Sequence, residues 1–192
     1  MAGRRRLFEE TEVLEKAMNV FWKKGYEATS TEDLLSAMDL NKGSLYNTFN
    51  SKKDLFIKVV DHFGDFLINT LERNIQAEEN ALDGIKNVFR NICKDTPEDR
   101  ERGCFLGNSV SELSNIDEDM ERKAILRLKS MQALFERHLK RAQEQGDINM
   151  GSDIRKQALH LVNLWNGLYV TLRMYDLKDL KEMIEMNLKL LK

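Results

Sequence analysis

The chain has 192 residues, enough for one domain or at most two small ones. Its 30 Lys and Arg residues nearly balance 32 Asp and Glu, so a protein that holds nucleic acid by bulk charge is excluded, and any DNA contact needs a local patch. A single proline and 26 Leu against 8 Val favour helices, because unbranched side chains lose little rotamer freedom there. An all-α protein is expected, and sandwich and barrel folds are not.

Several classes of protein are disfavoured by what the sequence lacks. Cys93 and Cys104 belong to no cysteine or histidine cluster, so neither a disulfide framework nor a metal site is expected. No signal peptide is visible, and no apolar run approaches the about 18 residues of a membrane span. We expect a cytoplasmic protein with no membrane partner.

Apolar spacing predicts about nine helices with short breaks between them. Ser30 and Asp33 have capping-box spacing, and Asn41, Ser51, Asn80 and Asp117 are further candidate N-caps. Residues 94–103 are highly charged, contain the only proline, and are predicted to form a loop. The predicted helices cover about residues 7–24, 31–38, 42–48, a long stretch from 52, 81–92, 105–113, a long stretch from 118, 154–175 and 177–191.

The first three predicted helices form a small unit with a polar third helix. Leu45 and Phe49 can turn inward, while Lys42, Tyr46 and Lys52 cluster around that helix. Two short helices joined by a tight turn are the geometry in which the second helix enters a major groove. From spacing alone, a helical bundle with a solvated basic turn remains equally open.

A dense set of motifs in this unit resembles the DNA-binding head of the TetR family of bacterial repressors. The motifs are FWKKGYEATS at 21–30, NKGSLYNTF at 41–49 and SKKDLF at 51–56, and the resemblance covers about residues 8–60. It implies a helix-turn-helix DNA-binding domain at 1–53 and a ligand-binding and dimerisation domain at 54–192. One departure is Asp39, at a turn position where the family often has Gly; Asp tolerates left-handed backbone better than most residues.

The resemblance further implies function and partners. The protein would be a ligand-responsive transcriptional regulator, expected as a repressor, that binds a palindromic double-stranded operator as a homodimer. A small-molecule or electrophile inducer would release it. The DNA-binding residues implied are Thr29, Ser30, Lys42, Gly43, Ser44, Tyr46, Asn47 and Lys52.

The body resembles the family only loosely, so its site residues are expectations from position and residue type. A ligand pocket is expected along Phe63, Phe66, Phe89, Cys104, Phe105, Met131, Phe135, Trp165 and Tyr169. A dimer face is expected on the last two helices at Leu161, Leu168, Leu172, Leu180 and Ile184. The alternative is that these aromatic and apolar positions are ordinary core of a monomer.

Residues 103–108, GCFLGN, with Glu112 after them, resemble an element in a TetR subgroup that includes the N-ethylmaleimide reductase repressor. Cys104 follows Arg100 and Arg102 at a predicted helix start, and both features would lower a thiol pKa and favour the reactive thiolate. A buried, inert cysteine is the alternative. Cys93 is expected on the core side of its helix and is the less favoured target.

Two other functional classes stay open at this point. An enzyme is one, but no nucleophile elbow, phosphate loop or zinc-protease motif is present, so no catalytic residue, metal or cofactor is expected. A helical interaction protein without DNA binding is the other. A gel shift with the DNA upstream of the chain's own gene separates both from a regulator.

Overall fold

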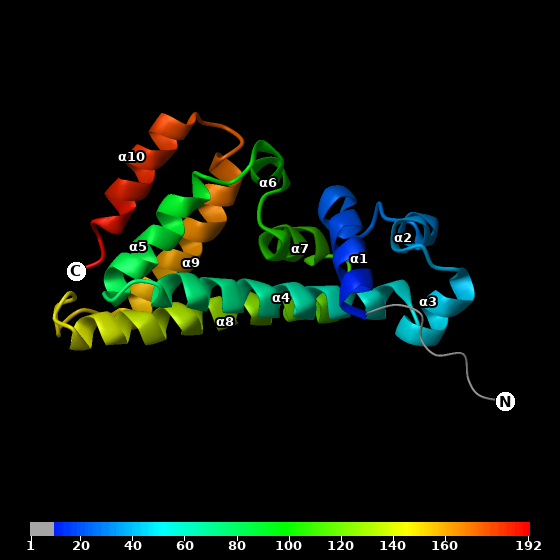
Figure 1. The fold of residues 1–192 in the computed structure, drawn as a ribbon, viewed down its shortest axis with the longest axis horizontal. Coiled ribbons are helices and arrows are strands. Elements are labelled where there is room, and N and C mark those ends of the chain that lie inside the picture. The colour runs from blue at the N-terminus through cyan, green and yellow to red at the C-terminus, as the bar shows by residue number, and fades with distance from the viewer. Residues whose placement is uncertain (1–9) are drawn as a thin grey trace. The chain divides into compact units, whose positions relative to one another are not determined.

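The computed structural model describes residues 10–192, and in this part of the chain every regular element is a helix (Figure 1). The predicted start of the first helix, at residues 7–9, lies outside the described residues. None of the helices combines the length and apolar character that a membrane crossing needs. The helices are α1 Glu10–Lys24, α2 Thr31–Met38, α3 Lys42–Phe49, α4 Lys52–Gln76, α5 Ala81–Ile92, α6 Pro97–Arg102, α7 Phe105–Leu113, α8 Glu118–Glu144, α9 Ile154–Thr171 and α10 Leu177–Leu188.

The all-α prediction is confirmed. Its main local error is α6, and α9 also ends at Thr171, before the predicted residue 175. The segment expected as a loop contains a short helix because its ends are well suited to one. The Thr96 side chain accepts from the Asp99 N–H, Pro97 occupies the first turn, and acidic residues precede basic ones as the helix dipole favours. A high density of charge therefore did not preclude a helix.

The predicted N-caps are confirmed. Ser30 and Asp33 form a complete capping box on α2, and the Asn41 and Asn80 side chains accept from the third residue of α3 and α5. The Ser51 hydroxyl accepts from the Asp54 N–H at 3.0 Å, and Asp117 accepts from two N–H groups at the start of α8. These bonds supply partners for amide groups that a helix start leaves unpaired.

The described chain divides into two compact units. The first comprises the chain up to Asp65 together with Asn108–Arg127, and the second comprises Phe66–Gly107 and Leu128–Lys192. Because α4, α7 and α8 each contribute residues to both, each unit is assembled from segments far apart in sequence.

The core of the first unit is aromatic. The Phe21 ring from α1 meets the Phe56 ring from α4 edge-on at 5.1 Å, and Leu45 and Phe49 of α3 are buried. Further buried members are Val13, Ala17, Leu34, Met38, Leu55, Val59 and Leu113.

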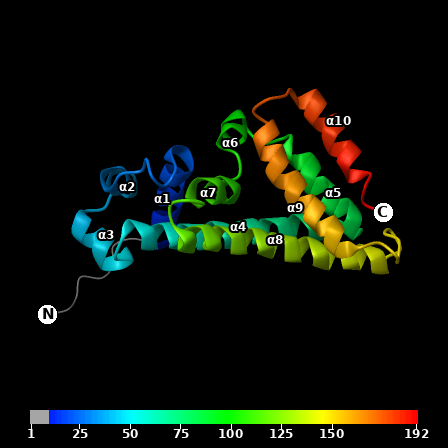
Figure 2. The ribbon, with the colours of Figure 1, turned by 180° about the vertical axis from the view of Figure 1, so that it is seen from behind.

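In the second unit, α10 packs on α5 and α9 (Figure 2). The buried stripe of α4 runs through Leu67, Leu71 and Ile75 in steps of four residues, which turns it progressively around the helix. Phe66 falls off this stripe and is 58% exposed, which corrects the expectation that it faces inward.

Gly84 provides a test of this packing. A Cβ atom at Gly84 would lie 2.4 Å from the carbonyl oxygen of Ile75, so α5 approaches the end of α4 as only glycine allows. We expect Gly84→Ala to lower the free energy of unfolding by about 1–3 kcal/mol, despite the better helix propensity of alanine. Urea unfolding measures it.

Gly151→Ala is the matched control, since a Cβ atom there meets nothing within 4 Å. It should change the free energy of unfolding by less than about 0.5 kcal/mol. Equal effects of the two substitutions would show that α5 does not approach Ile75 this closely.

Candidate nucleic-acid interface and effector region

Helix α3 has two distinct faces. Leu45 and Phe49 are each 1% exposed, whereas Lys42, Gly43 and Tyr46 face solvent. Asn47 is also exposed, and Ser44 is half-buried. The structure thus brings most of the expected recognition residues to one open, polar face.

The turn before α3 is held as the sequence indicated. Asp39 has the left-handed backbone expected at this position, with φ 54°, and its N–H donates to Leu35 O. Lys24, 2.5 Å from Asp33, together with Ser30 lowers the pKa of the Asp33 carboxyl to about 2. Because the pKa of Asp33 is lowered in the folded chain, the ionised carboxyl stabilises the fold above the ordinary aspartate pKa. This stabilisation is lost as the pH falls toward 2. The capping box is therefore charged at neutral pH.

Thr29 does not belong to the exposed set. Its side chain is 1% exposed and its hydroxyl donates to Gly25 O at 2.6 Å, so it is occupied inside the turn. The expectation that Thr29 contacts DNA through its side chain is corrected. Ser30 is exposed, with its hydroxyl engaged by Asp33 in the capping box.

Lys52 and Lys53, adjacent in sequence, have different surroundings. The Lys53 ammonium lies 2.7 Å from Asp117 and 3.4 Å from Asp119, so acidic side chains already neutralise it. The Lys52 ammonium instead lies over the Tyr26 ring, 4.3 Å from its centroid. Sequence reasoning assigned no role to Tyr26, because only the fold shows that its ring meets a lysine on another helix.

The second unit gathers five of the expected ligand residues into one aromatic cluster. Trp165 is at its centre: its ring lies 6.2 Å from Phe89 and 5.0 Å from Tyr169, and its indole N–H donates to Cys104 Sγ at 3.4 Å. Phe135 stacks near Phe89 at 5.7 Å. These rings come from α5, α8 and α9.

The Cys104 thiol is buried, 6% exposed, at the start of α7. The N–H of Gly107 and the indole of Trp165 both donate to its sulfur, which favours a thiolate, but burial dominates and raises the pKa of Cys104. This corrects the expectation of a thiol pKa lowered by Arg100 and Arg102.

A partly buried polar pair borders this cluster. The Tyr169 hydroxyl donates to Asp95 at 3.2 Å. Burial raises the pKa of Tyr169, and Asp95 adds to that rise. Burial also raises the pKa of Asp95.

The other expected ligand residues are placed differently. Phe63 meets Trp22 at 5.1 Å within the first unit. Phe105 and Met131 are buried, at 2% and 0% exposure, and Phe66 is on the surface.

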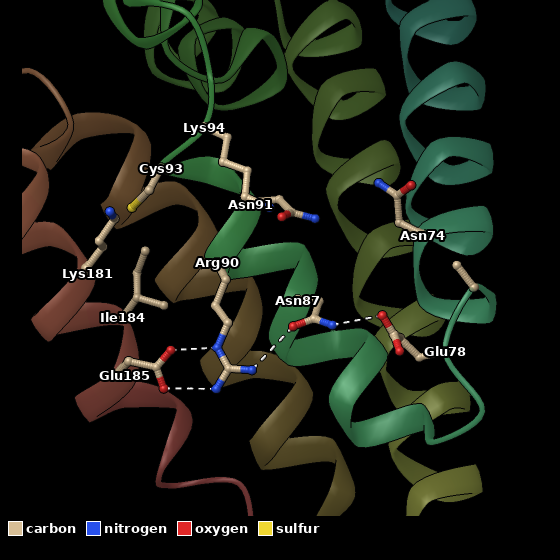
Figure 3. A pocket seen from close by; sticks show the side chains of 11 residues that line it. Asn74, Glu78, Asn87, Arg90, Asn91, Cys93, Lys94, Lys181, Ile184 and Glu185 are labelled. Atoms are coloured by element: carbon tan, nitrogen blue, oxygen red, sulfur yellow. Dashed lines mark hydrogen bonds and ion pairs between the residues drawn. The ribbon is translucent and has the colours of Figure 1, made fainter.

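A cavity of about 670 Å³ opens between α4, α5 and α10, and none of the expected ligand residues lines it (Figure 3). Polar side chains that line it pair with one another: Arg90 pairs with Glu185, and Asn87 joins Arg90 to Glu78. Sequence periodicity gave no signal for it, because most of its lining residues are polar; Cys93 and Ile184, which also line it, are buried.

The expected dimer residues are core residues of the single chain. Leu161, Leu168, Leu172, Leu180 and Ile184 are all at most 6% exposed. They pack within the second unit, so their assignment to the dimer face is corrected. The large apolar residues that α9, α10 and their connection do expose are Leu159, Val170, Met174, Tyr175, Leu177 and Met186, with Leu190 just beyond α10.

Comparison with known proteins decides the family. Residues 13–59 match the model described as bacterial regulatory proteins, tetR family, and residues 81–184 match the tetracyclin repressor-like C-terminal domain. The chain belongs to the TetR family. It is therefore a DNA-binding transcriptional regulator with a helix-turn-helix head and a helical body.

Curated relatives agree. The chain is 32% identical over 160 residues to the uncharacterized HTH-type transcriptional regulator YezE of Bacillus subtilis, covering 82% of this chain and 81% of that protein. It is 32% identical over 183 residues to the HTH-type transcriptional repressor ComR of Escherichia coli, covering 89% and 82%.

Solved structures share the fold. A cysteine mutant of CifR complexed with operator DNA superposes with a TM-score of 0.85 at 24% identity, over 99% of this chain and 100% of that one. The reduced form of Escherichia coli NemR gives 0.81 at 21% identity, over 94% of each chain.

The thiol chemistry gives a second prediction. Because burial raises the pKa of Cys104, the thiolate is scarce near neutral pH. N-ethylmaleimide should modify Cys104 in the folded protein much more slowly than in the urea-unfolded chain, and the rate should rise only at alkaline pH. Peptide mapping by mass spectrometry distinguishes Cys104 from Cys93, and Cys104→Ser is the control. A rate in the folded protein equal to that in urea would contradict the burial.

Proposed function

We propose that this chain is a homodimeric repressor that binds a palindromic operator through α3 and leaves it when a small molecule or an electrophile acts on its second unit. DNA contact is assigned to residues 1–53, and ligand binding and dimerisation to residues 54–192. The observation that carries the proposal is the exposed polar face of α3 over buried Leu45 and Phe49. A regulator of the bacterial chromosome would work in the cytoplasm.

The proposed contacts on DNA fall into two groups. Lys42, Gly43 and Ser44, in the first turn of α3, would meet base edges, because the N-terminal residues of a recognition helix enter the major groove. Tyr46 and Lys52 would contact phosphates, which position the protein without reading sequence. Asn47 and Ser30 flank these positions.

Dimerisation is supported by the apolar surface of α9, α10 and their connection. Exposed apolar side chains grouped on neighbouring elements are typical of a protein–protein interface. A two-fold dimer would bring two α3 helices to major grooves about 34–36 Å apart on a palindromic site.

For the effector, the aromatic cluster around Trp165 supports an apolar or amphipathic ligand. Cys104 at its edge supports an electrophile as a second class of effector, with the thiol reacting only when the cluster opens. The effector must bind the DNA-free state more tightly than the DNA-bound state, so operator DNA must weaken effector binding by the same factor.

A gel shift tests the DNA contacts. A Cβ atom at Gly43 meets only Asn41 Oδ1 at 3.4 Å, so α3 accommodates a side chain there. We expect Gly43→Val to weaken binding to the DNA upstream of the chain's own gene more than binding to random DNA, because it fills the groove-facing start of α3. Lys52→Ala, which removes a proposed phosphate contact, should weaken both and lower the salt slope by about 0.9.

The control for charge is Lys140→Ala, which removes an exposed lysine from α8 in the second unit. It should leave the salt slope unchanged. If Gly43→Val binds the upstream DNA as tightly as the wild type does, α3 is not the recognition helix.

The dimer face is tested by Met174→Glu, which adds a charge to the exposed apolar surface. Sedimentation velocity at micromolar concentration should show a dimer for the wild type and a monomer for the variant, because a buried unpaired charge is costly. Leu126→Glu, at another exposed apolar position, on α8, is the control and should stay dimeric. A monomeric wild type would refute the dimer.

A further inference from the structure

We propose that Glu112 is a positioning residue for DNA binding: its carboxylate fixes the turn after α1 so that Tyr26 presents the Lys52 ammonium to a DNA phosphate. The inference rests on the proposed DNA contact of Lys52. Glu112 follows the GCFLGN segment in the sequence, which by itself gave it no role.

Glu112 holds two consecutive amides of the turn. The N–H of Tyr26 donates to one carboxylate oxygen and the N–H of Glu27 to the other, each at 3.0 Å. Both amides lie just beyond the end of α1, at Lys24. A charged acceptor that takes one bond on each oxygen fixes the position and the orientation of this peptide segment.

Gly25 leaves the space that the Glu112 carboxylate occupies. Its φ is +81°, in the left-handed region, and a Cβ atom there would lie 2.8 and 3.0 Å from the two oxygens of Glu112. The glycine of the FWKKG motif thus serves both the turn and the approach of Glu112.

The turn held by Glu112 also determines where the Tyr26 ring lies. That ring lies 6.0 Å from Phe21 and 5.0 Å from Phe56, so it rests on the core of the first unit. Its face carries the Lys52 ammonium at 4.3 Å. A cation over an aromatic face is attracted by the ring quadrupole, which restricts the many rotamers of the lysine before DNA arrives.

The sign of the effect makes the idea testable. Glu112 is an anion in the unit that binds DNA, so by charge alone its removal should strengthen binding to phosphates. If Glu112 acts by positioning Lys52, its neutralisation should weaken binding instead. Glutamine has the same length but only one acceptor oxygen, so it can hold only one of the two amides.

The experiment measures binding of the full-length chain to a fluorescent random-sequence duplex, and to its own upstream DNA, over a range of salt concentrations. We expect Glu112→Gln to weaken binding to both by about threefold to tenfold, the scale of one lost hydrogen bond. The slope of log affinity against log salt should fall by up to about 0.9, as for Lys52→Ala.

The matched control is Glu118→Gln, which removes the same charge from an exposed position in the same unit. It should leave affinity unchanged or raise it slightly. The double variant Glu112→Gln, Lys52→Ala should bind no more weakly than Lys52→Ala alone, because both changes remove one phosphate contact.

Thermal unfolding checks that each variant folds. If Glu112→Gln does not fold, Tyr26→Phe is compared with Tyr26→Leu instead. Tyr26→Phe keeps the aromatic ring and should keep the salt slope, whereas Tyr26→Leu removes the ring and should lower the slope. Equal salt slopes for these two variants would overturn the inference. A Glu112→Gln protein that binds DNA as Glu118→Gln does would also overturn it, as would losses of affinity that add up in the double variant. A wild type that binds neither DNA would instead overturn the proposed function.

Discussion

Helix α3 has eight residues, and a helix of this length is not stable in water by itself. Its position depends on burial of Leu45 and Phe49 against the aromatic core, and on the Asn41 side chain that caps its first turn. The polar face can be open to DNA only because the opposite face is held in this way. Everything that orders the core of the first unit therefore also orders the recognition surface.

This requirement explains why the first unit includes residues 108–127 in addition to the three N-terminal helices. Glu112 holds the turn after α1, and Asp117 pairs with Lys53 at the start of α4. Farther along α4, Arg127 pairs with Asp61 and Asp65, with its side chain packed where any Cβ on Gly64 would clash. The head motifs read from sequence end near residue 60, but the unit that folds around them takes in this later segment.

The sequence predicted what is local. Caps such as Ser30 and Asn41 act over three residues, and the left-handed turn at Asp39 depends on one residue, so each could be read from the chain and was confirmed. Periodicity also identified apolar faces of the helices, but it does not say whether the same chain or a second copy covers each face. Leu161 and Leu168 were expected to face a second copy and are covered by their own chain, whereas Val170 and Met174 on the same stretch are exposed.

Thr29 and Cys104 show a second limit of prediction from sequence. At each residue, a contact that the local sequence does not reveal determines how the side chain behaves. Thr29 has the residue type that often binds phosphate, but the carbonyl of Gly25 takes its hydroxyl. At Cys104, desolvation raises the thiol pKa and is the larger effect, while hydrogen bonds from Gly107, Trp165 and Leu106 act to lower it. Burial depends on Trp165, 61 residues away, which no local pattern reports.

The surroundings of Cys104 also limit how an adduct there could be accommodated. Its sulfur accepts the Trp165 indole N–H, and the Cys104 side chain is buried, so an adduct there would add volume inside a packed region. Close-packed interiors do not absorb added volume without moving backbone or side chains, at about 1–3 kcal/mol. The backbone adjacent to Cys104 is the first turn of α7, and Glu112 is in the last turn of the same nine-residue helix. The cysteine that precedes α7 and the carboxylate that holds the α1 turn therefore belong to one short, continuous stretch of chain.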